Sequence, residues 1–297
     1  MSGRLRIFFD FLIFSNIFLS ICVTSLVFET SLVLTNGFND LRYPFFLFCA
    51  TLFLYCFHRV YRSDFRSQEE KLSARHLWIK NNLRFFYSVL VFSALGALIS
   101  AVLFVPFHIL ATLLPVALIS IGYTIPCLPW KGKWLRLRDL PGIKVFLIAL
   151  VLGLTTVLLP VLAYSSYGSL MSPAIFIIFL RRMFFIFAIT IPFDIRDLEY
   201  DQRNGTRTIP VILGVTKAKA VAFFALAIFI GLALFQYFMV SNTKIEYVFA
   251  LVLSALISAW MISISGKKKQ DRFYSVFLEG MMLLQCLLIL MASKLSL

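Results

Sequence analysis

The sequence contains nine apolar runs, each about as long as a membrane-spanning helix and separated from the next by a short polar break. A bilayer core is about 30 Å thick, so a helix needs about 20 apolar residues to cross it. With 61% apolar and only 14% charged residues, the chain cannot hide its apolar side chains in one soluble core. A soluble enzyme, a disordered chain and a disulfide-stapled secreted protein are therefore excluded. The runs lie near residues 7–28, 43–61, 83–104, 107–126, 144–164, 173–192, 218–240, 246–265 and 273–293.

These runs predict an all-α fold, a multi-pass integral membrane protein with about nine transmembrane helices around a central cavity. Cytoplasmic loops of membrane proteins are enriched in Lys and Arg. If the N-terminus is cytoplasmic, 23 of the 28 Lys and Arg fall in inner segments and only three in outer ones. We therefore predict an N-in, C-out topology. The net charge of +14 then reflects membrane orientation, and we expect no nucleic acid partner.

Several chemistries lack support in the sequence. The five cysteines are scattered without a CxxC pair, and the three histidines show no spacing typical of zinc ligands. Walker, GxGxxG and GxSxG elements are absent, which removes support for ATP-driven transport, dinucleotide binding and serine hydrolysis.

An acidic cluster follows the sixth predicted span. Only 14 residues of the chain are acidic, yet Asp194, Asp197, Glu199 and Asp201 lie within eight positions. On a continuous helix, Asp194, Asp197 and Asp201 would share a sector of about 60° on one face. Three adjacent carboxylates repel one another unless a cation neutralises them, and such a row suits Mg²⁺ bound together with substrate phosphates. The spacing alone equally allows a solvated helix end whose acids pair with neighbouring arginines.

The residues after the cluster carry a resemblance to a known family. Gly205, Thr208 and Pro210 complete the pattern D-x-x-D-x-x-x-D-x-x-x-G-x-x-T-x-P. This pattern, about 17 residues long, resembles the second aspartate-rich motif of the UbiA superfamily of intramembrane prenyltransferases. The number of spans and the place of the motif between spans six and seven are also similar to that family. The resemblance implies that residues 1–297 form a single UbiA-like prenyltransferase membrane domain.

Two other segments bear on the resemblance. Tyr123 at the end of span four and the run Pro141–Lys144 before span five resemble the family's Tyr and Gly-x-Lys pattern. The family's first aspartate-rich motif, N-D-x-x-D-x-x-x-D, corresponds here to residues 56–64, where Cys, Phe and Val replace its first three polar positions. Of the acids of that motif, only Asp64 is retained.

The resemblance implies a function and a set of site residues. The expected enzyme is a Mg²⁺-dependent prenyltransferase, a transferase of alkyl groups other than methyl, that moves a prenyl group from an isoprenoid diphosphate to a lipophilic aromatic or lipid-like acceptor. The expected location is the bacterial inner membrane, among membrane lipids, with the active-site loops cytoplasmic. The implied residues are Asp194, Asp197 and Tyr123 as catalytic groups, Asp194, Asp197, Asp201 and Asp64 as metal ligands, and Arg59, Arg62 and Lys144 as diphosphate ligands.

The degenerate first motif leaves other functions open. Fewer carboxylates predict fewer bound Mg²⁺ ions, and arginines near residues 59–66 could bind the diphosphate directly. A catalytically impaired relative that binds an isoprenoid or another lipid is the main alternative, and a transporter is a third, although no inverted repeat is apparent. Acceptor identity, prenyl chain length and oligomeric state are not encoded in these features.

Charges inside the spans give one further expectation. Arg181 and Arg182 fall in the middle of a predicted span, where an unpaired charge costs several kcal/mol. Glu279 lies in the ninth span, seven residues beyond Arg272. We predict a buried arginine–carboxylate pair that involves Glu279.

Overall fold

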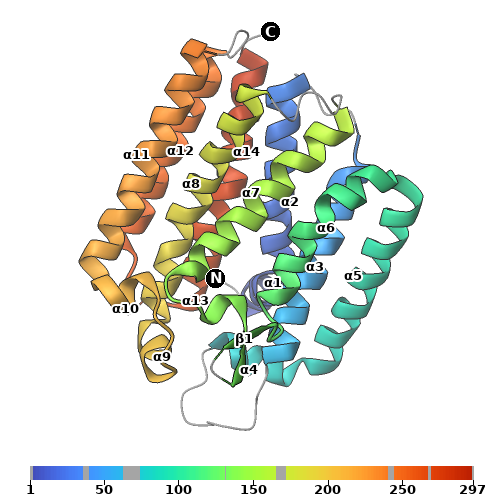
Figure 1. The fold of residues 1–297 in the computed structure, drawn as a ribbon, viewed down its shortest axis with the longest axis vertical. Helices are drawn as coiled ribbons and strands as arrows, with labels where there is room; N and C mark the ends of the chain where they lie inside the picture. The colour runs from blue at the N-terminus through green and yellow to red at the C-terminus, as the bar shows by residue number, and fades with distance from the viewer. Residues whose placement is uncertain are drawn as a thin grey trace.

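The computed structural model describes residues 3–35, 40–62, 74–130, 132–164, 172–239, 244–266 and 269–295. This part of the chain forms a bundle of long helices (Figure 1). Apolar segments in lipid must satisfy every backbone hydrogen bond internally, and a helix does so within one segment. The long elements are α2 (Ile17–Thr35), α3 (Arg42–Arg62), α5 (Leu83–Phe104), α7 (Ile143–Tyr164), α8 (Pro173–Arg196), α11 (Val215–Met239), α12 (Ile245–Ile264) and the segment Asp271–Leu295.

All eight of these segments are long and apolar enough to cross a membrane. The helix expected at 107–126 is shorter, since α6 (Phe107–Gly122) has 16 residues. At 1.5 Å per residue it is about 24 Å long, less than the hydrocarbon core. A ninth crossing therefore stays a prediction. The last segment consists of α13 (Asp271–Phe273), the π-helical stretch η4 (Tyr274–Glu279) and α14 (Gly280–Leu295).

The first predicted span, 7–28, is wrong in its limits. The chain forms α1 (Gly3–Phe14), breaks, and then forms α2. Asn16 adopts a left-handed φ of 66°, which Asn tolerates better than most residues, and its carbonyl accepts a hydrogen bond from the Ser20 hydroxyl at 3.0 Å. The polar pair Ser15–Asn16 inside an apolar run therefore interrupts the helix.

The helices are arranged with α2, α7, α8 and α14 in the middle of the bundle. Figure 1 shows α11 and α12 on one side of them and α3, α5 and α6 on the other. Contacts join α8 to α7 and α11, and join α2 to α3, α7 and α14. Large side chains such as Phe92, Phe107 and Phe249 are more than two-thirds exposed, as expected for groups that face lipid.

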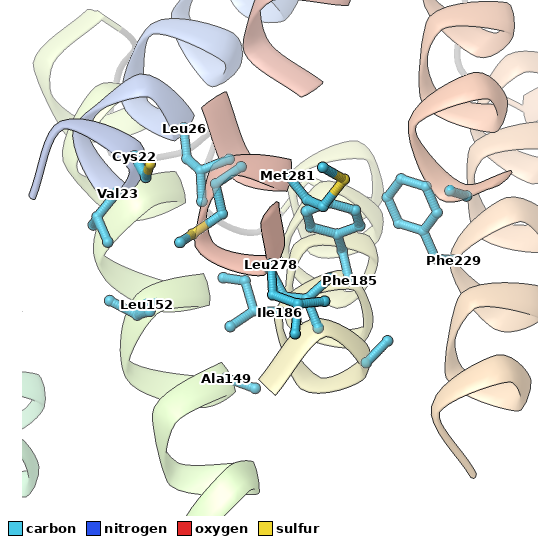
Figure 2. Packing of buried hydrophobic residues seen from close by; sticks show 14 of the residues in the cluster. Cys22, Val23, Leu26, Ala149, Leu152, Phe185, Ile186, Phe229, Leu278 and Met281 are labelled. Atoms are coloured by element: carbon cyan, nitrogen blue, oxygen red, sulfur yellow. The ribbon is translucent and has the colours of Figure 1, made fainter. Parts of the chain in front are cut away.

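The core lies where the central helices meet (Figure 2). Leu26 of α2, Leu152 of α7, Ile186 of α8 and Met281 of α14 are all buried there. The rings of Phe185 and Phe229 connect α8 to α11, with centroids 5.2 Å apart. These contacts fix α8, the helix that carries the acidic cluster at its end.

The polar breaks hold short elements at the end of the bundle opposite the C-terminus (Figure 1). They were not predicted from the sequence. They are α4 (Ala74–Asn81), the antiparallel hairpin β1 (Leu128–Trp130) and β2 (Lys133–Leu135), the 3₁₀ turn η2 (Leu137–Asp139), α9 (Leu198–Arg203) and α10 (Ile209–Leu213).

Candidate active site

The acidic cluster lies where α8 ends, and its helix is not continuous. Asp197, with φ −85° and ψ 6°, lies between the end of α8 at Arg196 and the start of α9 at Leu198, so the regular helix is interrupted between Asp194 and Asp201. Both of these carboxylates are nevertheless buried, with side chains only 2% exposed, and both face Lys144 of α7. Lys144 Nζ is 2.6 Å from Asp194 Oδ1 and 3.5 Å from Asp201 Oδ2.

Asp197 has a different environment. Its carboxylate accepts hydrogen bonds of 2.8 and 3.1 Å from Arg196, and its side chain is 34% exposed. The Arg196 guanidinium also lies 3.5 Å from Asp271 and over the ring of Tyr274, at 5.2 Å from its centroid. The pairing with Arg196 is what the simple ion-pair reading of the sequence expected, while Asp194 and Asp201 form the two-carboxylate site.

Two glycine turns bring Lys144 to the acidic cluster. Gly142 and Gly205 have φ values of 71° and 67°, which side chains with a Cβ rarely adopt. The Gly142 amide donates a hydrogen bond of 2.8 Å to the carbonyl of Arg207, which joins the loop before α7 to the loop after α9. After the Gly205 turn, the Thr206 amide donates to the Asp201 carbonyl at 2.9 Å. The glycine in the sequence motif thus shapes the loop around Asp201.

Arg136 and Asp139 support the loop that precedes Gly142. The guanidinium of Arg136 donates hydrogen bonds of 2.9 and 3.0 Å to the Asp139 carboxylate. Burial alone would raise the pKa of Asp139, but the hydrogen bonds and charge of Arg136 outweigh it and hold the pKa below its usual value. Asp139 is therefore ionised at neutral pH and forms a charge pair within the loop.

Tyr123 and His58 lie beside the ammonium–carboxylate cluster. Tyr123, directly after α6, lines a pocket together with Leu147 and Ile148, one helical turn beyond Lys144 on α7. The ring centroid of His58 is 5.5 Å from that of Tyr123, and His58 Nδ1 is in contact with the Thr124 hydroxyl. Sequence reasoning did not single out His58 for a role, because a lone histidine at a helix end has no spacing signal.

An apolar pocket of about 70 Å³ opens next to these two rings. Its walls come from α3, α6 and α7, and only His58, Ser120, Tyr55 and Tyr123 contribute polar atoms. At this volume the pocket is smaller than the usual ligand site of about 300–1,000 Å³, and it has room for only a few carbon atoms. The remaining lining residues are Leu54, Ile119, Leu147, Ile148, Val151 and Leu152.

Of the other site residues expected from the sequence, the structure describes some and not others. Arg59 is half-buried on α3, next to His58, and has an electrostatic effect on it. Arg62 ends α3, but its side chain lies outside the described residues. Asp64 also lies outside them. The structure thus brings together Asp194, Asp201, Lys144 and Tyr123.

The donor set at this site fits a hard cation that is shared with a substrate. Asp194 Oδ2 is buried and has no hydrogen-bond partner within the described ranges. A buried carboxylate oxygen without a partner is costly, and a cation would satisfy it. No group of three or more His, Cys, Asp or Glu side chains that could hold a metal occurs among the residues that the structure describes. Mg²⁺ typically takes one or two carboxylates and completes its shell with water and substrate phosphates, so Asp194 and Asp201 suit it.

The buried arginines of α8 have a partner that the sequence prediction missed. Arg181 Nη2 is 3.3 Å from Glu29 Oε1, and Arg182 Nη2 is 2.7 Å from Glu29 Oε2. Both arginines pair with a buried carboxylate, but this is Glu29 and not Glu279, so the predicted pair of Glu279 with an arginine stays a prediction. Glu279 is buried in η4 and lies within electrostatic reach of Arg196. Glu29 is 152 residues away from Arg181, and no local pattern links them.

Comparison with known proteins places these features in a family. The model of the UbiA prenyltransferase family matches residues 79–286. No curated protein matches the sequence.

Solved structures share the fold at low sequence identity. A UbiA homologue from Archaeoglobus fulgidus bound to GPP and Mg²⁺ is 16% identical, with a TM-score of 0.65 over 96% of this chain and 99% of that one. The apo UbiA homologue from Aeropyrum pernix K1 is also 16% identical, with a TM-score of 0.65 over 93% and 98% of the two chains. A digeranylgeranylglyceryl phosphate synthase is 18% identical, with a TM-score of 0.58 over 96% and 97%.

Proposed function

The chain belongs to the UbiA prenyltransferase family, and from this we propose that it is an intramembrane prenyltransferase that moves a prenyl group from an isoprenoid diphosphate to a lipophilic acceptor with the help of Mg²⁺. The observation that carries the proposal is the buried pair Asp194 and Asp201, which share the Lys144 ammonium. Homologues solved with GPP or DMAPP and Mg²⁺ support the substrate class and the metal.

We assign the roles of the charged residues as follows. Asp194 and Asp201 hold the metal ion. Asp197, at the junction of α8 and α9, is a third candidate metal ligand and catalytic group, as expected from the sequence. When bound, Mg²⁺ supplies positive charge to the diphosphate oxygens as negative charge develops on them. Lys144 and the cations of α3, Arg59 and Arg62, neutralise the rest of that charge. Asp64 remains a candidate metal ligand.

We assign the apolar pocket beside Tyr123, about 70 Å³ in volume, to the reacting allylic end of the prenyl group. The allylic C–O bond of the donor breaks, diphosphate leaves, and the acceptor forms the new bond to the prenyl carbon and gives up a proton. Apolar walls keep bulk water from the allylic carbon, and the faces of Tyr123 and Tyr55 can stabilise positive charge on it. A membrane location suits such a site, because the prenyl chain of the donor is lipid-soluble whereas its diphosphate must be bound by positively charged groups.

We place this site in one domain formed by the whole chain, at the cytoplasmic face of a bacterial inner membrane. The support for the sidedness is the distribution of Lys and Arg, most of which fall in the loops on the side of the acidic cluster.

The main alternative, a relative that binds an isoprenoid without turning it over, is favoured by one observation. The stretch of α3 where the family's first acidic motif falls carries Cys56, Phe57 and Val60 instead of acids or amides. One experiment separates the two functions.

The test uses membranes that contain the protein, radiolabelled farnesyl or geranylgeranyl diphosphate, Mg²⁺ and a lipid extract as the source of acceptor. The proposal expects diphosphate release and a labelled lipid product, with release reduced about 10²–10³-fold in Asp194→Asn. Glu199→Gln, an exposed carboxylate of the same cluster, is the matched control and should behave as the wild type. Tight binding without release would identify the non-catalytic alternative, and the absence of both binding and release would contradict both functions.

A further inference from the structure

Within the described residues, the end of α3 offers no carboxylate where the family's first acidic motif falls, and Asp64, the one acid retained there, lies outside them. Cys56 is fully buried, and its thiol lies 3.7 Å from the Ser15 carbonyl and 3.8 Å from Asn16 Nδ2. The Phe57 ring lies among other aromatic rings, 6.0 Å from Phe53 and 5.8 Å from Tyr61 between centroids. A thiol held by the α1–α2 break and an aromatic side chain cannot bind a hard cation.

Two guanidinium groups lie at this place instead. Arg59 follows His58 on α3, and Arg138 belongs to η2; the Nε atoms of both arginines are buried. The His58 ring lies 5.5 Å from the ring of Tyr123, between centroids. Arg138 also lies over the Tyr123 ring, with Cζ 5.4 Å from the centroid. Arg138 was not among the residues expected from the sequence, because it comes from a loop with no pattern of its own.

Tyr123 connects these arginines to the carboxylate site. Arg138 lies over its ring, and Tyr123 lines the same pocket as Leu147 and Ile148, which are one helical turn beyond Lys144 on α7. Lys144 in turn contacts Asp194 and Asp201. The order across this end of the bundle is therefore arginine pair, aromatic ring, ammonium and carboxylate pair.

The charges of this array match a diphosphate and a single divalent cation. Asp194 and Asp201 contribute two negative charges, while Lys144, Arg59 and Arg138 contribute three positive ones. Arg62 and Asp64, whose side chains lie outside the described residues, carry opposite charges and leave this sum unchanged. The neighbouring residues Asp197 and Arg196 pair with each other, as do Asp139 and Arg136.

A terminal phosphate carries roughly −1.5 to −2 at pH 7, and the second phosphate of a diphosphate adds about one more negative charge. The array and one Mg²⁺ together carry about three positive charges, close to the value that a bound prenyl diphosphate needs. A second Mg²⁺ would leave the buried site about two charges too positive, which low-dielectric surroundings make costly.

We propose that Arg59 and Arg138 form a metal-free half of the diphosphate site, so that this protein binds its diphosphate with one divalent cation at Asp194 and Asp201. Guanidinium groups grip phosphate oxygens through paired N–H donors without a metal. The inference rests on the proposed function for its substrate class, and its test does not depend on turnover.

The first test measures metal stoichiometry in the purified full chain, with Mn²⁺ as the probe and inorganic pyrophosphate as the ligand. Electron paramagnetic resonance of free Mn²⁺ should show one ion bound per chain at saturating pyrophosphate. Asp194→Asn should remove that ion and retain weak pyrophosphate binding in the presence of EDTA. Two ions per chain, or no binding of pyrophosphate without metal, would overturn the proposal.

The second test measures pyrophosphate affinity in the arginine variants by calorimetry. Arg138→Gln and Arg59→Gln should each weaken pyrophosphate binding about 10–100-fold, as expected for the loss of charged hydrogen bonds, while Mn²⁺ binding without pyrophosphate stays unchanged. Arg138→Lys keeps the charge but not the planar fork, and should fall between wild type and Arg138→Gln. Arg203→Gln removes an exposed cation from α9 and should have no effect.

Wild-type pyrophosphate affinity in Arg138→Gln, or an equal loss in Arg203→Gln, would contradict the half-site. A protein that passes both tests but releases no diphosphate from a prenyl donor would refute the proposed enzyme and leave the half-site standing.

Discussion

Helix α8 carries two buried ionic clusters that differ in their surroundings. Near its middle, Arg181 and Arg182 share Glu29 of α2, and all three side chains are at most 3% exposed. At its end, about 18 Å away at 1.5 Å per residue, Asp194 and Asp201 share Lys144. The second cluster adjoins Tyr123 and two loops joined by a backbone hydrogen bond, whereas helices enclose the first.

The difference shows that burial and charge alone do not identify a functional site. Arg182 Nη1 lacks a hydrogen-bond partner within the described part of the chain, just as Asp194 Oδ2 does. The first cluster nevertheless fits a structural role, because Arg182 also donates to the Thr30 hydroxyl at 3.1 Å and so ties α8 to α2 twice. The second cluster differs because it adjoins two loops and lies on α7 one helical turn from Leu147 and Ile148, which line the apolar pocket, whereas no residue of the first cluster lines it.

Among variants that test the difference between the two clusters, Glu29→Gln should change the protein's stability the most. This change leaves two buried guanidinium groups without a counter-charge, which typically costs 3–5 kcal/mol. We expect a free energy of unfolding lower by about that amount, measured by denaturant titration in detergent, and a reduced folded yield. Glu199→Gln, at an exposed position, is the control. Unchanged stability in Glu29→Gln would remove the case for a structural role.

The second effect concerns Lys144, whose ammonium occupies the space between two potential metal ligands. Lys144→Met removes a cation that competes with a metal for Asp194 and Asp201. In the absence of diphosphate, the variant should bind Mn²⁺ about tenfold more tightly, while prenyl transfer decreases because one diphosphate ligand is lost. Weaker Mn²⁺ binding in this variant would show that Lys144 orders the carboxylates and does not compete with a metal.

A smaller effect is expected at Asp197. Because this carboxylate pairs with Arg196 and is one-third exposed, Asp197→Asn should reduce prenyl transfer only about 3–10-fold. The Mn²⁺ affinity should change less than in Asp194→Asn. An equal loss in the two variants would restore Asp197 to the role that the continuous-helix prediction gave it.

The smallest effect should follow replacement of the whole mid-helix cluster. Glu29→Leu, Arg181→Met and Arg182→Met together remove both the charges and their desolvation cost, and buried ion clusters can often be replaced in this way without loss. The free energy of unfolding should stay within about 1 kcal/mol of the wild type, and the rate of diphosphate release should be unchanged. A selective loss of activity in a stable triple variant would mean that the first cluster also serves the reaction.

Much of the fold follows from the hydropathy of the sequence, because lipid-spanning helices need long apolar runs. The predicted helix limits are wrong where a few polar groups determine the backbone conformation. Ser15 and Asn16 end α1 within an apolar run, and α6 stops at Gly122, before the predicted limit of its run at residue 126. The hairpin β1–β2 lies in a loop with no alternating pattern.

The candidate site was predictable where a local motif specified it. The positions of Asp194, Asp201 and Lys144 follow from short patterns, and the structure brings these residues together. The pairing of Asp197 with Arg196 was not predictable from helical spacing, since it depends on where α8 ends. The contacts of Glu29 and Arg138 join distant parts of the chain, which periodicity along one helix cannot reveal.

The hydrogen bond from the Gly142 amide to the Arg207 carbonyl has a consequence for variation in this protein. Both partners are backbone groups, so the spacing between Lys144 and the acidic cluster does not depend on the side chain at position 207. Many residues at 207 could keep the two loops together. At position 142, proline would remove the donor and any Cβ would strain the turn. The distance between the Lys144 ammonium and the carboxylates thus depends on a backbone hydrogen bond that tolerates most substitutions at position 207 and almost none at position 142.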